Sequence, residues 1–196
     1  MKIFINPGHC PGIDSGAVGN GLKECDVALK IGKRVEKYLK AAGFDVKLLQ
    51  ADTPTETFNE ICDPANDWNA DFFISIHCNS FASSSANGTE SFCFSRGGTA
   101  EKLATAIHKR ILKHIPELTD RGIKTANYAV LRKTKMPAVL VETAFISNAH
   151  DAKLLVEKED EFARAIACGV TDYLQGGNPI PDVIDSPTCP TCGKKL

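Results

Sequence analysis

The sequence predicts an α/β fold with three layers, in which helices cover both faces of a mostly parallel, twisted sheet. Short apolar runs of strand length alternate along the chain with longer segments whose apolar residues recur with helical periodicity. The connections between strands are long enough to be helical crossovers, which join parallel strands. At 196 residues the chain has the length of a single domain with a short appendage.

The first elements predict a βαβ unit. The apolar run Lys2–Asn6 predicts a strand, and the turn-rich stretch Pro7–Gly21 predicts a loop. In Glu24–Ala42 the apolar residues share one helical face, which predicts a helix that ends at Gly43. Asp45–Leu49 then predicts a strand parallel to the first.

The next segment predicts a weaker helix and a strong strand. A helix capped by Thr53 or Thr55 runs toward Trp68, and Pro64 weakens or breaks it. The apolar run Asp71–Ile76 predicts the strand that follows.

The second half of the chain predicts further strands and two long helices. We expect strands over Glu90–Ser95, Tyr128–Leu131 and Pro137–Glu142. Apolar residues in register predict helices over Gly98–Ile115 and Glu159–Leu174.

The composition changes near the carboxyl end. A linker rich in glycine and proline begins near residue 176, so we predict a globular domain over residues 1–175 and a linker and tail over 176–196. The tail contains Cys189-Pro190-Thr191-Cys192, which resembles half of a zinc ribbon and normally needs a second cysteine pair. We interpret the tail as disordered or as a remnant, and as a second zinc site only if another chain completes it.

Charge and composition exclude several classes of protein. The net charge is −1 and acids and bases are interspersed, which argues against a nucleic-acid partner. No apolar run is long enough to span a bilayer, and no signal peptide is visible, so we expect synthesis in the cytoplasm. The 8 cysteines are scattered, which predicts reduced and mostly buried thiols.

Polar residues stand at the ends of three predicted strands. His9 and His77 follow two strands, and Glu142 ends a third. Because the carboxyl ends of parallel strands line one crevice, we expect these side chains to meet there. Together with Glu24 at the start of the first helix, the histidines offer the three ligands of a catalytic zinc. Glu142 is then free for proton transfer. Each residue alone has an ordinary structural explanation, and the four together favour the metal site.

The motifs around these residues resemble those of the zinc-dependent N-acetylmuramoyl-L-alanine amidases, in the branch often called amidase type 3. The resemblance extends from Lys2 to about Leu174, and its motifs stand in the family's order. They are Asn6-Pro7-Gly8-His9, Glu24, Ser75-Ile76-His77-Cys78-Asn79-Ser80 and Val141-Glu142-Thr143-Ala144-Phe145-Ile146-Ser147-Asn148.

The resemblance implies that His9, Glu24 and His77 hold one zinc ion and that Glu142 is the general acid and base. It implies a peptidoglycan hydrolase of autolysin or endolysin type. In such an enzyme a zinc-activated water cleaves the amide between N-acetylmuramic acid and L-alanine of the stem peptide.

Two further residues are candidates for substrate binding by the same resemblance. Asn79 stands two places after the second histidine and is a candidate for contacting the peptide. Arg132 is a candidate for meeting a substrate carboxylate or the developing oxyanion.

A cysteine follows each proposed zinc ligand, and relatives often have glycines where Cys10 and Pro11 stand. A thiolate can compete for zinc. Because neighbouring side chains of a strand point to opposite faces, we expect Cys78 to point away from the site. A disulfide between Cys10 and Cys25 is a weaker alternative.

Other functions and several cellular settings stay open. The chain could be another zinc peptidase or amidase that acts on a different cell-wall bond, or a catalytically silent cell-wall-binding domain. We expect a monomer whose partner is peptidoglycan. Its substrate lies outside the plasma membrane, so lysis, a pore, a role in the sporulating mother cell or a signal peptide lost from this sequence must bring the two together.

Overall fold

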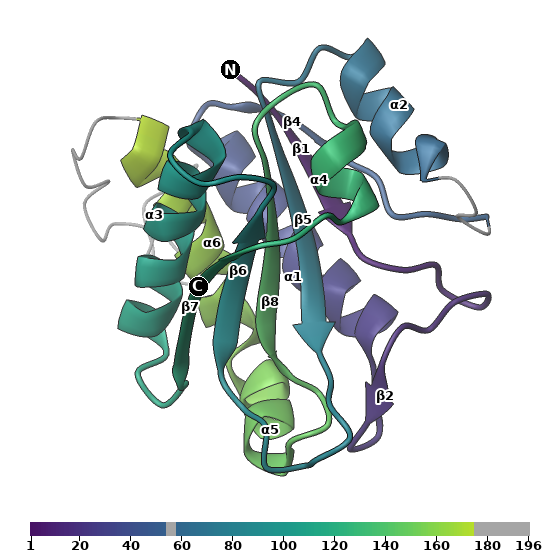
Figure 1. The fold of residues 1–196 in the computed structure, drawn as a ribbon, viewed down its shortest axis with the longest axis vertical. Coiled ribbons are helices and arrows are strands. Elements are labelled where there is room, and N and C mark those ends of the chain that lie inside the picture. The colour runs from purple at the N-terminus through teal and green to yellow at the C-terminus, as the bar shows by residue number, and fades with distance from the viewer. Residues whose placement is uncertain (54–57, 175–196) are drawn as a thin grey trace, which may run out of the picture.

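The computed structural model describes residues 1–53 and 58–174 and contains a six-stranded sheet between two layers of helices (Figure 1). The strand order is β4-β1-β5-β8-β6-β7. The strands are β1 (Lys2–Pro7), β4 (Asp45–Leu48), β5 (Phe72–Asn79), β6 (Thr89–Cys93), β7 (Asp120–Thr125) and β8 (Ala138–Phe145). The first four strands in this order are parallel, and β6 pairs antiparallel with β8 and parallel with β7. The predicted three-layer class with a mostly parallel sheet is therefore confirmed.

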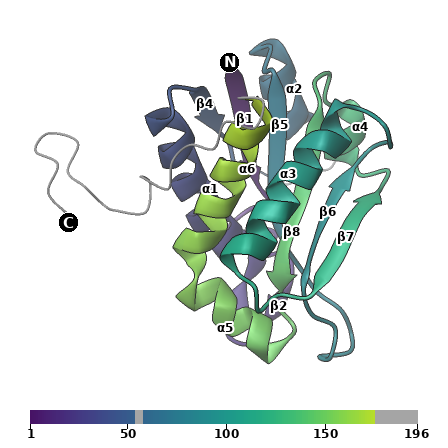
Figure 2. The ribbon, with the colours of Figure 1, turned by 90° about the vertical axis from the view of Figure 1, so that its left-hand side faces the viewer.

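Three long helices cover one face of the sheet (Figure 2). They are α1 (Glu24–Ala41), α3 (Thr99–His114) and α6 (Glu159–Leu174), and α6 packs against both of the others. Strand residues such as Ile5, Ile76 and Val141 are fully buried beneath these helices. These residues belong to the larger of the two hydrophobic cores, which lies between the three helices and this face of the sheet.

Two short helices, α2 (Asn59–Asp67) and α4 (Ala129–Lys133), lie over the opposite face (Figure 1). The smaller core beneath them contains Phe4, Phe73 and Leu140, each from a neighbouring strand. Along these strands the same face turns polar toward the carboxyl ends, because successive residues on one face are two apart. The polar residues on this face are Asn6, Ser75, His77, Asn79 and Glu142. The alternation of the strands thus delivers a row of polar side chains to one edge of an apolar face.

One predicted strand is wrong. Tyr128–Leu131 was expected to be extended, but Tyr128 precedes helix α4, in which Val130 and Leu131 are both buried. An apolar run this short does not distinguish a strand from a helical turn, and here two adjacent side chains are buried rather than alternate ones.

Several elements differ from the sequence-based expectation. The loop after β1 contains a small hairpin of β2 (Val18–Gly19) and β3 (Leu22–Lys23). Strand β7 was missed because its residues are largely polar at the sheet edge. Helix α5 (Ala149–Glu157) was missed although the Asn148 side chain accepts hydrogen bonds from the N–H groups of its first turn.

Pro64 lies inside α2 without ending it. Its ring removes one backbone hydrogen bond, but Ile61, Cys62 and Ala65 on the same helix remain buried against the smaller core. Packing of this apolar face therefore outweighs the lost hydrogen bond.

The cysteines of the described chain behave as expected. None of these cysteines forms a disulfide, and all are buried except the half-buried Cys168; they are Cys10, Cys25, Cys62, Cys78, Cys93 and Cys168. Cys10 and Cys25 are thus not joined by a disulfide. Within residues 1–53 and 58–174, no helix is long and apolar enough to cross a membrane. The predicted linker and tail, with Cys189 and Cys192, lie outside the described residues.

Candidate active site

A cleft of about 570 Å³ opens at the carboxyl ends of the central strands. One wall holds the four residues expected to carry chemistry, which are His9, Glu24, His77 and Glu142. The opposite wall comes from α2 and α4 and includes Phe58, Ile61, Tyr128 and Val130. One wall of the cleft is therefore polar and the opposite wall is largely apolar, which is the usual composition of a ligand-binding site.

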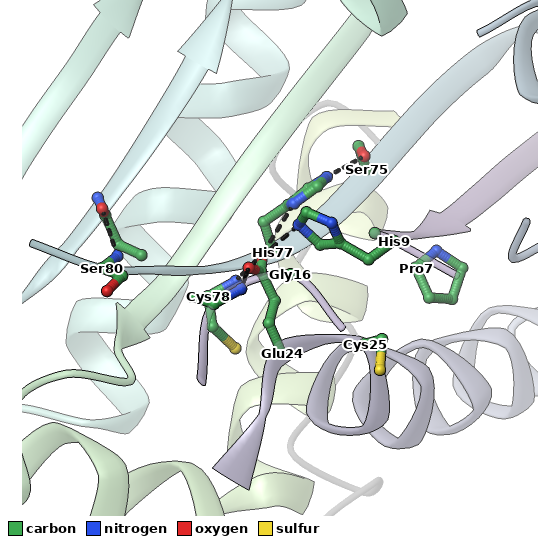
Figure 3. A network of polar contacts seen from close by, with 12 residues as sticks. Pro7, His9, Gly16, Glu24, Cys25, Ser75, His77, Cys78 and Ser80 are labelled. Atoms are coloured by element: carbon green, nitrogen blue, oxygen red, sulfur yellow. Dashed lines mark hydrogen bonds and ion pairs between the residues drawn. The ribbon is translucent and has the colours of Figure 1, made fainter. Parts of the chain in front are cut away.

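Three of these side chains form a compact cluster around one carboxylate (Figure 3). Glu24 Oε2 lies 3.1 Å from His9 Nε2, and Glu24 Oε1 lies 2.9 Å from His77 Nδ1. One ligand atom from each of the three residues lies within 4.8 Å of the other two. The sequence-based expectation that these residues meet is therefore correct.

Glu24 is held by more than the two histidines. It is the first residue of α1 and only 4% exposed. Its Oε2 also accepts from the Ala17 N–H at 2.8 Å, and its Oε1 accepts from the Cys78 N–H at 3.0 Å. Burial by itself would raise the pKa of Glu24, but the hydrogen bonds from His77 and His9 outweigh it and hold the pKa well below its ordinary value. Glu24 is thus a permanent anion at the helix N-terminus.

His9 is fixed by the loop that follows β1. Its backbone has a φ of 64°, and its Nδ1 lies 2.8 Å from Asp14 Oδ2. Burial would lower the pKa of His9, but in the absence of a metal the hydrogen bonds to Glu24 and Asp14 raise it to about 9. The ring is therefore oriented by a carboxylate on the side away from Glu24.

Two glycines let the backbone close around the cluster. A Cβ at Gly16, where φ is +63°, would lie 2.6 Å from Glu24 Oε2 and 2.5 Å from His9 Cδ2. A Cβ at Gly8 would lie 2.3 Å from His77 Cε1. Both positions therefore exclude any side chain while the cluster keeps this geometry.

Glu142 shares the cleft but has a different environment. Its Oε2 is the one buried side-chain N or O atom in the described part of the chain that lacks a hydrogen-bond partner. Burial raises the pKa of Glu142 to about 7. The residue stands in register with His77 on β5 and with Glu90 on β6. An unpartnered carboxylate in this position can take up and release a proton near neutral pH.

Glu90 is a site residue that the sequence analysis missed. It is 5% exposed, and its Oε2 accepts from Arg121 Nε at 2.8 Å and from Lys124 Nζ. Its Oε1 accepts from Asn79 Nδ2 at 2.7 Å. Burial would raise the pKa of Glu90, but Lys124 and Arg121 lower it. An acidic residue inside the otherwise uncharged strand Thr89–Cys93 was the available signal.

The two candidates for substrate binding both line the cleft. Asn79 is fixed at its amide by Glu90, and its Oδ1 accepts from the Ser80 N–H at 2.8 Å. Arg132 lies on α4, and its Nη1 donates to Asn127 Oδ1 at 2.7 Å. These contacts fix both side chains, and they leave further polar hydrogens of each available.

The donor set fits one zinc ion. Two imidazole nitrogens and one carboxylate are the three protein ligands of a catalytic zinc, which keeps a fourth position for water or substrate. The ligand cluster of the described residues contains no thiol. The Sγ of the buried Cys78 faces Thr143 Oγ1 at 3.5 Å, and Cys25 Sγ donates to Asp26 Oδ1 at 3.6 Å. This confirms that Cys78 points away from the cluster.

Comparison with known proteins agrees with this geometry. The family profile described as N-acetylmuramoyl-L-alanine amidase matches residues 3–172. The N-acetylmuramoyl-L-alanine amidase LytC of Bacillus subtilis is 41% identical over 177 residues, which cover 88% of this chain and 35% of LytC. The sporulation-specific N-acetylmuramoyl-L-alanine amidase of the same organism is 38% identical over 178 residues, which cover 89% of this chain and 67% of that protein.

A solved structure gives the same result. The amidase AmiC2 of Nostoc punctiforme superposes with a TM-score of 0.82 at 38% identity and covers 89% of this chain and 97% of that one. The chain spans about a third of the length of LytC, so the likeness concerns one domain of that relative. This chain belongs to the N-acetylmuramoyl-L-alanine amidase family.

Proposed function

We propose that this chain is a zinc-dependent peptidoglycan hydrolase. It cleaves the amide that joins the lactyl group of N-acetylmuramic acid to L-alanine of the stem peptide. Family membership supports the choice of bond. The observation that carries the proposal is the meeting of the His9, Glu24 and His77 cluster with the unpartnered carboxylate of Glu142 in one cleft.

His9, Glu24 and His77 would hold the zinc ion. When bound, zinc supplies a Lewis acid that polarises a carbonyl and lowers the pKa of a water. The ligand residues contribute orientation, because each is fixed on its far side by the protein. Asp14 holds His9, and the Ala17 and Cys78 N–H groups hold Glu24.

Glu142 moves the proton. Its carboxylate lines the cleft and would accept the proton of the attacking water, with no hydrogen bond at Oε2 to compete for the charge. The same carboxyl group would then give the proton to the alanine nitrogen, because an amide nitrogen leaves readily only as an amine. A pKa of about 7 makes both the charged and the neutral form accessible near neutral pH. The reaction needs no covalent intermediate with the protein.

Arg132 and Asn79 both line the cleft and would bind the substrate there. The Arg132 guanidinium is anchored by Asn127 at the apolar wall and offers its other N–H donors to a carboxylate of the stem peptide or to the oxyanion. Asn79 keeps one amide hydrogen beyond its bond to Glu90 and offers it to the peptide.

The setting of the reaction is the cell wall. This setting is supported by relatives that include an endolysin of Bacillus phage SPP1 and a germination-specific N-acetylmuramoyl-L-alanine amidase of Bacillus subtilis. We propose that the domain over residues 1–175 acts as a monomer. The Cys189 and Cys192 tail would bind a second zinc only if another chain supplied the missing ligands.

Product analysis tests the function. Purified peptidoglycan is incubated with the protein, with chelator-treated protein, and with chelator-treated protein after zinc is restored. We expect free stem peptides that begin with alanine, intact glycan strands, and activity only in the zinc-containing samples. Release at a different bond would indicate another zinc peptidase or amidase. Binding to peptidoglycan without cleavage would indicate a silent wall-binding domain, and either result would contradict the proposal.

A further inference from the structure

We propose that Ser75 and Asn6 are positioning residues that fix the His77 ring in the tautomer that presents a bare Nδ1 to the metal. The proposal rests on the proposed zinc site. It assigns a role to two buried polar side chains that lie outside the ligand cluster of His9, Glu24 and His77. The chain of hydrogen bonds has a direction, and that direction follows from what each group is able to donate.

Two backbone carbonyls fix the orientation of the Asn6 side-chain amide. Its side chain is 1% exposed, and its Nδ2 donates to the Leu49 carbonyl at 3.0 Å and to the Pro7 carbonyl at 3.2 Å. Because a backbone carbonyl only accepts hydrogen bonds, the amide nitrogen must face these two oxygens. The Asn6 Oδ1 is thereby turned toward Ser75.

Ser75 passes the direction on. It is fully buried, and its Oγ lies 3.0 Å from Asn6 Oδ1. An amide oxygen cannot donate, so the single Ser75 hydroxyl hydrogen goes to Asn6. The Ser75 Oγ is then able only to accept from its second partner, His77 Nε2, which lies 3.1 Å away. His77 Nε2 must therefore carry a hydrogen.

The opposite ring nitrogen is the one that faces the metal position. His77 Nδ1 lies 2.9 Å from Glu24 Oε1, on the inner side of the cluster, and Figure 3 shows Ser75 and Glu24 on opposite sides of this ring. Zinc would take the place of the hydrogen between His77 Nδ1 and Glu24 Oε1. Because Nε2 keeps its hydrogen for Ser75, the lone pair offered to zinc would be the one on Nδ1. The backbone carbonyl of Leu49 therefore selects, through two side chains, which nitrogen of His77 binds zinc.

His9 is oriented by a different device. Its outer partner is the exposed carboxylate of Asp14, 53% exposed, rather than a buried neutral relay. The relay adds no charge to a cleft in which Glu24 and Glu142 already place two carboxyl groups. A neutral Ser75 therefore orients the second histidine without a further buried anion.

The test compares two buried hydroxyl groups that touch the same histidine. Ser75→Ala removes the contact to the His77 ring. The control Thr143→Val removes a hydroxyl that is also fully buried and donates to the His77 backbone carbonyl at 2.9 Å. Zinc affinity is measured by competition with a chromogenic chelator, and stability by thermal unfolding of the zinc-free proteins.

We expect both variants to unfold at lower temperature, and only Ser75→Ala to bind zinc more weakly, by roughly 10- to 100-fold. Equal zinc affinity of Ser75→Ala and wild type would overturn the inference, and so would an equal loss in Thr143→Val. Failure of wild type itself to bind zinc would instead overturn the proposed function.

Two further comparisons guard against a simple packing effect. Ser75→Thr and Ser75→Val add the same bulk and differ only in the hydroxyl, so we expect Thr to keep the higher zinc affinity. Adding Asn6→Leu to Ser75→Ala should weaken zinc binding no further, because Asn6 acts through Ser75. Equal affinities of the Thr and Val variants, or additive losses in the double variant, would contradict the relay.

Discussion

Glu24 and Glu142 are the same residue type, line the same cleft and are both largely withdrawn from water, yet the protein gives them opposite electrostatic environments. Both oxygens of Glu24 accept hydrogen bonds, from two imidazoles and two backbone N–H groups. The Oε2 of Glu142 accepts none. The pKa of Glu24 is consequently held well below its ordinary value, whereas that of Glu142 is raised to about 7.

The number of hydrogen-bond donors around each carboxylate, rather than its burial, decides the role of that carboxylate. Burial raises the pKa of both, and only at Glu24 do hydrogen bonds overturn that effect. A carboxylate that stays charged suits a metal ligand, and one that exchanges a proton near neutral pH suits an acid and base. The predictions below test this division.

The largest effect should come from Glu142→Gln. We expect turnover of peptidoglycan to fall on the order of 10²- to 10⁴-fold, because the amide cannot carry the proton between water and alanine nitrogen. Zinc content should stay at the wild-type level, since Glu142 is not a ligand. The measurements are the release of alanine amino termini and elemental analysis of the purified variant. Loss of zinc together with activity would erase the distinction between the two carboxylates.

Glu24→Gln should give the opposite pattern. The variant keeps the shape of the side chain but loses its charge. Whichever carboxylate oxygen the NH₂ group replaces, it then faces a backbone N–H donor, that of Ala17 or that of Cys78. We expect zinc affinity to fall by about 100-fold or more, and activity to fall with it because the metal is absent. Chelator competition measures the affinity, and excess zinc should restore part of the activity. A variant that binds zinc normally but is inactive would mean that Glu24 serves chemistry rather than ligation.

Gly16→Ala tests how closely the loop after β1 must pack against Glu24. The new Cβ would lie 2.6 Å from Glu24 Oε2, whereas Gly12→Ala, also at positive φ, meets nothing within 4 Å. Both variants should lose roughly 1–2 kcal/mol of stability from the left-handed backbone. Only Gly16→Ala should also bind zinc more weakly, by about tenfold, or ~1.4 kcal/mol. Denaturant unfolding and chelator competition separate the two effects, and equal zinc affinities would show that the loop yields without disturbing Glu24.

The chemistry-bearing residues could be predicted because they obey simple positional rules. His9 follows β1, and His77 and Glu142 lie toward the carboxyl ends of β5 and β8, which parallel strands bring to one edge of a sheet. Glu24 follows from its place at the start of an amphipathic helix that packs on the same sheet. The fold class followed from the alternation of elements for the same reason.

The surroundings of those residues could not be predicted, because they depend on which strands are neighbours. Glu90 meets Glu142 only because β6 inserts antiparallel beside β8, and no local pattern in Thr89–Cys93 records that register. The Asn6 to Ser75 contact likewise requires β1 and β5 to be adjacent, in the register that pairs these two residues. Sequence periodicity assigns a residue to a face, while pairing between distant strands decides its partner.

The smallest predicted effect concerns stability and follows from the sign of the Glu142 shift. Burial raises its pKa from 4.5 to about 7, so the folded protein holds this proton more tightly than the unfolded chain does. Wild type therefore loses stability as the pH rises from 4.5 to 7. Over this range the unfolded chain releases the Glu142 proton, whereas the folded protein still holds it.

Glu142→Gln has no carboxyl to ionise, so it does not undergo this loss of stability. We expect the zinc-free variant to be more stable than zinc-free wild type at pH 8. Below pH 4.5 we expect it to be less stable than wild type, because Glu142 is then neutral in both the folded and the unfolded protein and only the cost of the buried amide remains. The full shift is equivalent to about 3 kcal/mol, and the cost of a buried amide without partners reduces the gain to about 1 kcal/mol. Urea unfolding at the two pH values measures this difference in stability.

Conversely, Glu24→Gln should lose stability at pH 8, because it removes a charge that four donors stabilise. Opposite signs for the same chemical change within one cleft would show that the carboxylate of Glu142 is kept reactive at the expense of stability, while the carboxylate of Glu24 stabilises the fold.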